Sequence, residues 1–448
     1  MTSSRPISAS LDNRAIWAIA IPAMITNVAT ALIGVGDMWI VGQLNHAATQ
    51  GAVDVGARLF AILFTVMNFL KTGTTGLVAQ AGTRSGEHEQ ARLLARSMAI
   101  ALAIAALLLL AKPVLMPLML DALGAKSDVL AAARIYAEIR YWTAPGVMLN
   151  LALIGFLVGR RQMMAVLAIE AGYNLLNVAL GLFLALQLDW GIAGIGWSSF
   201  AAEYAKLAVL LGFVFLGVKG RARASTMLDR TVLHWDAIRP FLSVNRDLFL
   251  RTLVLVLSFA AITRLSAGRG EVVLAANGII YQMFILTALI LDGFENAAQV
   301  LNGERMGAQD RSGFAAYVRA ILLRGMGAAV LVAGFFALAA GAVLESFAAT
   351  DEVARTALDL RIWLVILPFA GVTSFIFDGV FVGASWTRAM LISMCGAAVV
   401  LALSLYLTWP LGSHGLWASF VLFLLVRAGL QLALLPGRMR QGFGGGER

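Results

Sequence analysis

Twelve long apolar segments limit what this chain can fold into. Each is about long enough, at roughly 20 residues, to cross the hydrocarbon core of a bilayer. Because an unpaired backbone group is costly in lipid, such segments cross as helices. The segments lie at approximately 15–41, 54–79, 92–114, 128–152, 162–186, 190–217, 240–264, 272–300, 316–342, 354–382, 388–409 and 413–436.

The composition supports this interpretation. The chain is 60% hydrophobic and 13% charged, whereas soluble domains average about 25% charged residues. We therefore predict an all-α integral membrane protein of about twelve helices. The first apolar segment is too long for a signal peptide, so we expect it to be retained.

Basic side chains concentrate in alternate connections. Arg84, Arg160, Arg221 and Arg305 lie on one predicted side together with both termini, and the opposite connections carry acidic residues such as Asp351. The positive-inside rule then places both termini in the cytoplasm of a multi-pass protein of the bacterial inner membrane. The formal charge of +9 is explained by this topology, so no nucleic-acid partner is expected.

The two halves of the sequence resemble each other. Residues 80–86 (QAGTRSG) echo 301–307 (LNGERMG), 155–159 (GFLVG) echo 379–383 (GVFVG), and 196–200 (GWSSF) echo 416–420 (LWASF). The shift is about half the chain each time. We predict two pseudo-symmetric six-helix lobes around a central cavity. The expected boundaries are an N-lobe at 1–217, a cytoplasmic linker at 218–239 and a C-lobe at 240–448.

Asp37 is the only charged residue within the apolar segment from Ile19 to Gly42. A carboxylate at membrane depth costs roughly 2.5–3.5 kcal/mol on insertion scales, so it is either protonated, paired or in contact with water. Pro22 lies in the same segment and can bend a helix. A structural carboxylate and a tolerated kink are the alternative readings. We expect instead a titrating group and a hinge on one helix.

Several sequence words resemble the multidrug and toxic compound extrusion (MATE) family, in particular its DinF-like branch. The first segment carries IPA at 21–23, GD at 36–37 and VG at 41–42. The longer words are FLKTGTTGLVAQA at 69–81, NRDLFLRT at 245–252, LAAN at 274–277 and LDGF at 291–294. The resemblance covers essentially the whole chain. It implies a two-lobed antiporter, driven by a proton or sodium gradient, that expels cationic or lipophilic compounds.

The resemblance also implies roles for particular residues. It assigns proton coupling to Asp37 and bending to Pro22, with Asn177 and Ser199 completing a polar cluster in the N-lobe. Some archaeal relatives carry a second carboxylate where this chain has Gly181, so a mechanism with two carboxylates does not transfer directly.

Other polar residues within the apolar segments are candidates for a substrate or cation cavity. Glu170, Asn174 and Asn177 share one helix face, where they form either a cavity wall or a polar helix–helix contact; Asn174 is grouped with the coupling site. Glu203 and Lys206 are able to pair with each other, and Asp378 with Arg251. The cavity candidates are Glu170, Glu203, Asp292, Glu295, Asp378, Arg251 and Gln282.

The sequence thus predicts a proton-coupled multidrug efflux antiporter, acting by alternating access as a monomer on organic cations and lipophilic drugs. A sodium-coupled antiporter with a Na⁺ site near Asp378 is the first alternative. A lipid-linked precursor flippase of the same superfamily is the second, kept open by Arg251 and Lys206. No nucleotide loop, metal quartet or nucleophile motif indicates an enzyme, and no cofactor is expected.

Overall fold

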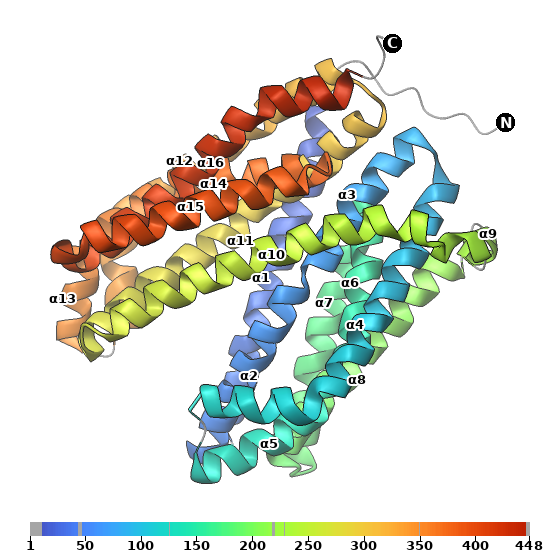
Figure 1. Ribbon diagram of the computed structural model, residues 1–448. Coiled ribbons are helices and arrows are strands. Elements are labelled where there is room, and N and C mark those ends of the chain that lie inside the picture. The colour runs from blue at the N-terminus through green and yellow to red at the C-terminus, as the bar shows by residue number, and fades with distance from the viewer. Residues whose placement is uncertain are drawn as a thin grey trace. The chain divides into compact units, whose positions relative to one another are not determined.

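The computed structural model describes residues 11–43, 47–124, 126–216, 220–227, 229–348 and 350–444; the side chains at 32–39, 41–43, 47–50 and 230 lie outside the described set. Helices dominate (Figure 1), and the described part contains no strand. Within it, eleven helices are long and apolar enough to cross a membrane, or twelve if one bent pair counts as a single span. The predicted all-α membrane architecture is confirmed.

The chain divides into two compact units. The N-terminal unit contains Ile25–Val78 and Ser85–Asn245, and the C-terminal unit contains the residues through Met24, Ala79–Arg84 and those from Arg246 onward. The helices up to the linker are α1 (Asn13–Gln43), α2 (Ala47–Met67), α3 (Phe69–Arg84), α4 (Glu87–Ala122), α5 (Ser127–Tyr141), α6 (Ala144–Gly159), α7 (Met163–Gly181), the π-helical turn η1 (Leu182–Gln187) and α8 (Gly191–Phe215).

The remaining helices follow, beginning with two short ones in the linker. They are α9 (Gly220–Met227), η2 (Arg230–Leu233), α10 (Trp235–Ala267), α11 (Glu271–Gly307), α12 (Arg311–Phe347), α13 (Asp351–Asp359), α14 (Arg361–Gly383), α15 (Thr387–Leu407), η3 (Trp409–Leu411) and α16 (Gly412–Phe443). An aromatic group holds the core of the C-terminal unit together. The ring of Phe420 lies 4.9 Å from that of Phe284 and 5.6 Å from that of Phe259, both edge-on or tilted.

The compact units differ from the expected lobes at the start of α1. The backbone of α11 at Gly293 is so close to Ala20 and Met24 that an added Cβ would lie 2.6 Å from the Ala20 carbonyl oxygen. The Trp17 and Phe294 rings also meet, at 5.5 Å. The first three turns of α1 therefore belong to the C-terminal unit, whereas the residues from Ile25 belong to the N-terminal unit.

The end of α3 joins the C-terminal unit through its polar side chains. The Gln80 amide donates to the carbonyl oxygen of Gly383 at 2.6 Å, and the Thr83 hydroxyl donates to that of Glu304 at 2.8 Å. The sequence alone did not indicate these two contacts, because the paired residues lie more than two hundred positions apart in the chain.

The span expected at 128–152 is broken into α5 and α6, which meet at 50°. Pro145 lies in the first turn of α6, where its missing N–H costs no hydrogen bond. The break frees backbone carbonyl groups, and the Tyr204 hydroxyl from α8 donates to that of Trp142 at 2.9 Å. A side chain from a neighbouring helix thus replaces the missing backbone partner, as lipid requires.

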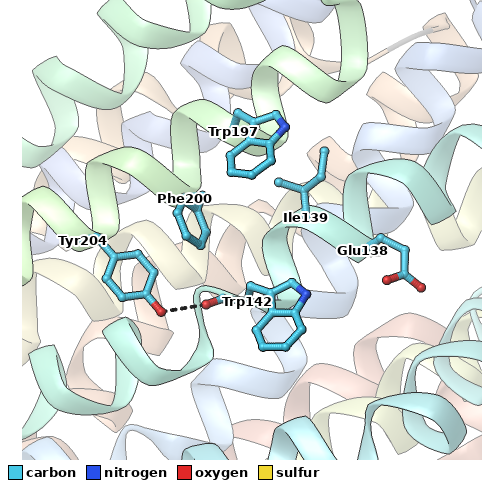
Figure 2. A pocket seen from close by; sticks show the side chains of 6 residues that line it. All are labelled: Glu138, Ile139, Trp142, Trp197, Phe200 and Tyr204. Atoms are coloured by element: carbon cyan, nitrogen blue, oxygen red, sulfur yellow. Dashed lines mark hydrogen bonds between the residues drawn. The ribbon is translucent and has the colours of Figure 1, made fainter.

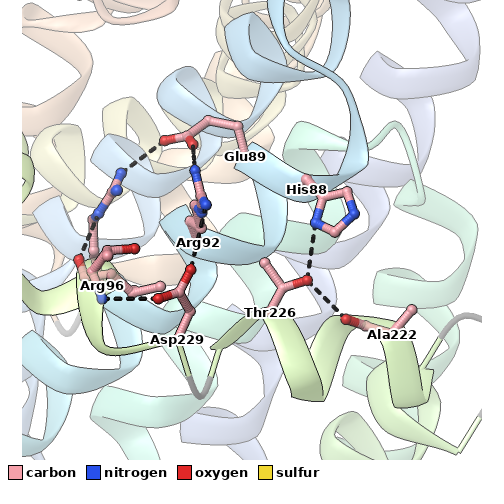
Figure 3. Close-up of polar contacts among 9 residues, drawn as sticks. His88, Glu89, Arg92, Arg96, Ala222, Thr226 and Asp229 are labelled. Atoms are coloured by element: carbon pink, nitrogen blue, oxygen red, sulfur yellow. Dashed lines mark hydrogen bonds and ion pairs between the residues drawn. The ribbon is translucent and has the colours of Figure 1, made fainter.

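The linker is fastened to α4 by charged side chains (Figure 3). Glu89 accepts from Arg96 at 2.8 Å and lies 3.7 Å from Arg92, which reaches Asp229 at 3.5 Å. The backbone N–H of Thr231 and then Arg92 lower the pKa of Asp229, because each favours its ionised form. The linker is therefore a docked part of the N-terminal unit.

Two pairs of glycines explain one of the internal sequence repeats. In α6, a Cβ on Gly155 or Gly159 would lie 2.6–2.7 Å from a carbonyl oxygen of α3. In α14, a Cβ on Gly379 or Gly383 would lie 2.2–2.4 Å from a carbonyl oxygen of α11. Each repeat therefore brings two helix backbones together, as small residues commonly do in membranes.

This packing predicts that Gly379→Ala destabilises the protein. The new methyl group collides with the Glu295 backbone, so we expect a loss of about 1–3 kcal/mol and a lower melting temperature in detergent. Gly327→Ala in α12 is the control, because no atom lies within 4 Å of its added Cβ. Equal melting temperatures for the two variants would contradict the packing argument.

Candidate functional site

A seam of polar side chains runs between α7 and α8 inside the N-terminal unit. At one end, the Asn177 amide donates to the Ser199 hydroxyl at 3.5 Å, and both residues are buried. Asn174 and Glu170 follow on the same face of α7 at helical spacing, and α8 contributes Glu203 one turn after Ser199. The seam collects most of the N-lobe residues that the sequence singled out.

Three charges meet at the other end of the seam. The Lys206 ammonium lies 3.2 Å from Glu203 Oε1 and 3.6 Å from Glu170 Oε1. All three side chains are at most 10% exposed. The ammonium also lies 3.9 Å from the centroid of the Tyr173 ring, where a cation is attracted to the aromatic face. The predicted Glu203–Lys206 pair is thus part of a triad of two carboxylates and one ammonium.

Asn150 on α6 is hydrogen-bonded to Glu203 of this triad. Its amide nitrogen donates to Glu203 Oε1 at 2.7 Å and to the Glu203 carbonyl oxygen at 3.1 Å. Gly146, at the start of α6, is close enough that an added Cβ would lie 3.3 Å from Glu203 Cγ. The break between α5 and α6 therefore brings the first turns of α6 against the buried carboxylate.

Several amide atoms along the seam have no hydrogen-bond partner among the described groups. They are Oδ1 of Asn150, Oδ1 of Asn177, and both Oδ1 and Nδ2 of Asn174. An unpaired buried polar atom costs about 1–3 kcal/mol. Such atoms are commonly satisfied by ordered water, so this seam offers several partners for water molecules inside the unit.

Helix α1 approaches the seam one turn from Asp37. Ile40 is fully buried, and its Cδ1 would lie 2.9 Å from a Cβ added to Gly181 on α7. The same Cβ would lie 3.5 Å from Ser198 Oγ on α8. The side chain of Asp37, three residues before Ile40 in the chain, lies outside the described residues. The small residue at 181 is what permits this close approach.

Pro22 lies inside α1, which continues helically on both sides of it, and its side chain is buried. It stands two residues before the point at which α1 passes from one compact unit to the other. A proline interrupts the helical hydrogen-bond ladder there.

A second charged cluster lies inside the C-terminal unit, centred on Asp378 of α14. Its Oδ2 accepts from Arg251 of α10 and, at 2.8 Å, from Arg427 of α16. Its Oδ1 accepts from Gln431 at 2.7 Å. Asp378 and Gln431 are fully buried and Arg427 nearly so. The expected pairing of Asp378 with Arg251 is present, with a second arginine added.

This cluster bears on the sodium alternative. Two guanidinium groups already supply Asp378 with the positive charge that a sodium ion would bring. Asp292 and Glu295 lie on α11, and the Glu295 carbonyl oxygen would be 2.2 Å from a Cβ on Gly379, the neighbour of Asp378. Gln282 is exposed, also on α11. Within the described residues, no group of three or more His, Cys, Asp or Glu side chains could hold a metal ion.

A pocket of about 440 Å³ opens beside the break between α5 and α6 (Figure 2). It is lined by Trp142, Trp197, Phe200 and Tyr204 with Ile139 and Glu138. Glu138 is already paired with Lys112 at 2.5 Å. The pocket lies at a lateral surface of the N-terminal unit, since Trp142 and Trp197 are about half exposed.

Sequence reasoning missed Asn150, Tyr173, Arg427 and Gln431. Each is a polar residue inside an apolar segment, which is a signal of function or pairing in a membrane protein. Their partners are unpredictable from the sequence because they lie on other helices, 49 residues away for Arg427 and Asp378.

The buried cluster predicts that Arg427→Met strongly destabilises the C-terminal unit. Removing one partner of a buried ion pair usually costs about 3–5 kcal/mol, so the melting temperature should fall clearly. Arg58→Met is the control, since its pair with Asp54 is solvent-exposed and should contribute about 0–1 kcal/mol. Two similar small shifts in melting temperature would refute a stabilising role for the cluster.

Comparison with known proteins gives a consistent result. The sequence model of the MatE family matches residues 22–183 and 248–407. DNA damage-inducible protein F of Escherichia coli (strain K12) is 34% identical over 426 residues, which cover 95% of this chain and 92% of that protein. A probable multidrug resistance protein NorM of Rhizobium meliloti (strain 1021) is 26% identical, over 90% and 86% of the two chains.

Solved structures agree on the fold. A crystal structure of MATE in the bent conformation superposes with a TM-score of 0.85 at 18% identity and covers 96% of each chain. The family model matches two segments of the chain, and one relative is more than 30% identical over most of its length. The helical architecture is shared as well. The chain belongs to the MatE family of membrane transporters.

Proposed function

We propose that this transporter is a proton-coupled multidrug antiporter that exports organic cations and lipophilic compounds, with Asp37 as the coupling carboxylate. The exchange requires no cofactor besides the coupling ion. A bacterial inner membrane, with both termini in the cytoplasm, is the setting that the basic connections favour.

One observation carries the assignment of Asp37. The turn of α1 that contains Ile40 packs on Gly181, which also lies beside Ser198, at the end of the polar α7–α8 seam. We expect the carboxyl group of Asp37, one turn away on α1, to meet the hydroxyl and amide groups of this seam, which tolerate both its charged and its neutral form. Its protonation would then change how α1 packs, and a change in packing biases the conformational equilibrium of the transporter.

Pro22 is the proposed hinge of α1. The residues of α1 through Met24 belong to the unit that contains α11, whereas those from Ile25 belong to the N-terminal unit. A helix that belongs to two units must bend when one unit moves and the other does not. A proline is the point of a helix where bending costs least free energy.

The alternatives are less well supported. A sodium-coupled antiporter would need a cation site, but Arg251 and Arg427 already neutralise Asp378. A flippase for lipid-linked pyrophosphates would need basic groups available for phosphate. Here Arg251 pairs with Asp378, and Lys206 pairs with Glu203 and Glu170.

The proposal predicts the behaviour of Asp37→Asn in proteoliposomes with separately imposed proton and sodium gradients. The wild type should export an organic cation with the proton gradient alone. Asp37→Asn should abolish this transport, because asparagine cannot exchange a proton, while the melting temperature stays close to that of the wild type.

Asp54→Asn is the matched control, because Asp54 is an exposed carboxylate on α2 that is paired with Arg58. It should transport normally. Proton-driven export by Asp37→Asn at the wild-type rate would overturn the assignment, and export driven only by sodium would favour the sodium-coupled alternative.

The hinge predicts that Pro22→Ala transports more slowly than the wild type, by roughly tenfold, although it folds at least as well. Alanine restores a helical hydrogen bond and stiffens α1. Pro117→Ala in α4 is the control, since that proline is exposed within a single helix of one unit. Rates and melting temperatures are measured on the same preparations, and an unchanged rate for Pro22→Ala would argue against bending.

A further inference from the structure

We infer that the α7–α8 seam is a proton path, and that Glu203 and Glu170, gathered around Lys206, are its proton-accepting carboxylates at the end remote from α1. The inference rests on the proposed proton coupling and extends it from one residue to a route. A route is needed because a proton bound near the middle of the membrane must reach water on the side of release.

The triad is arranged to hold one exchangeable proton. One ammonium lies within 3.6 Å of two carboxylates, so it fully balances only one of them. The second carboxylate is buried beside the first, and two carboxylates at close range favour one shared proton. A proton on either Glu203 or Glu170 leaves a neutral acid next to a complete ion pair.

The charged and titratable groups that face the triad come from four helices. Helix α7 contributes Glu170 and Tyr173, and α8 contributes Glu203, Lys206 and Tyr204, on which the charge of Glu203 acts. Helix α6 contributes the neutral amide of Asn150, and the charge of Arg140 on α5 acts on Tyr173. The described groups around the two carboxylates therefore include one ammonium in contact with them and one guanidinium group further away.

The amide groups between the two ends supply the path. Asn177 and Asn150 are each 1% exposed, and both have an oxygen with no described partner. Asn174, located between Asn177 and Glu170 on α7, has neither its oxygen nor its nitrogen paired. Buried amides in this condition are partners for ordered water, typically about three hydrogen bonds to each molecule. A file of waters that links such groups carries protons by exchange of hydrogen bonds.

The seam is about 10 Å long, because Glu170 and Asn177 lie seven residues apart on α7. Glu170 itself lies seven residues, again about 10 Å, after the start of α7 at Met163. The seam therefore moves a proton about 10 Å from the α1 end toward the start of α7.

Each transfer is a single proton exchange. An O–H bond forms on a carboxylate oxygen of Glu203 or Glu170 as an O–H bond of an adjacent protonated water breaks. On release, the same carboxyl O–H breaks and the proton passes to water at the far end of the seam. No oxidant, reductant or further reactant takes part.

The sharpest test is Asn174→Leu. Asn174 makes no hydrogen bond to a described group, so leucine of similar size removes no described hydrogen bond. A purely structural seam predicts an equal or higher melting temperature and unchanged transport. The proton path predicts an equal or higher melting temperature with proton-driven transport slowed by roughly tenfold, and unchanged affinity for tetraphenylphosphonium as the probe cation. Transport at the wild-type rate would overturn the path.

Glu203→Gln tests the triad. It keeps the shape and the hydrogen-bonding capacity of the side chain but cannot take up a proton. We expect the pH profile of proton-driven transport to change shape, and the infrared band of a protonated carboxyl group to weaken. Glu138→Gln is the control, since Glu138 is also paired with a lysine in the same unit but is about half exposed. Its pH profile and infrared band should match those of the wild type.

The outcomes separate the two proposals. If a proton gradient does not drive export by the wild type, the proposed function fails and the path fails with it. If the gradient drives export and Asp37→Asn abolishes it, while Asn174→Leu and Glu203→Gln keep the wild-type rate and pH profile, the path alone fails. If Glu203→Gln lowers the melting temperature but leaves the pH profile of transport unchanged, the triad is structural and the path is also overturned.

Discussion

Charges at membrane depth must find partners within the protein, and each compact unit is organised around one solution to this constraint. In the C-terminal unit, Asp378 is enclosed by two arginines and a glutamine, so α10, α14 and α16 are held at a single point. In the N-terminal unit, the ammonium of Lys206 serves two carboxylates at once. The first arrangement places one carboxylate between two guanidinium groups, and the second places one ammonium between two carboxylates. The two units therefore have different electrostatic characters despite their related sequences.

Most of the fold was predictable because lipid restricts the possible structures so strongly. Apolar length fixed the number of spans, and the repeated glycine words correctly indicated equivalent elements, which proved to be close contacts of α6 with α3 and of α14 with α11. The break after Tyr141 was not predictable. The residues around it are apolar enough to continue a helix, and the Tyr204 hydroxyl that compensates for the break lies on another helix. The division of α1 between the two units was not predictable either, because it depends on contacts between residues far apart in the chain.

The candidate site divides in the same way. The face formed by Glu170, Asn174 and Asn177 followed from helical spacing, and the pairing of Glu203 with Lys206 followed from their separation by three residues. Helical spacing does not predict the further partner that each of these groups finds on another helix. Asn150 and Arg427 are polar residues in apolar segments, and only the fold determines which carboxylate each one meets. The role of Asp37 came from family resemblance together with the cost of a carboxylate in lipid, and it stays a proposal.

The placement of the first turns of α1 has a consequence for how the protein is made. The backbone N–H of Asp12 donates to the hydroxyl of Tyr317, 305 residues later in the chain. At synthesis rates of about 5–20 residues per second, the ribosome needs tens of seconds to supply that partner. During this interval the opening helix must wait in the bilayer with its C-terminal-unit face covered by lipid or by other proteins. The contact between the residues before α1 and α12 therefore forms only after Tyr317 has been synthesised.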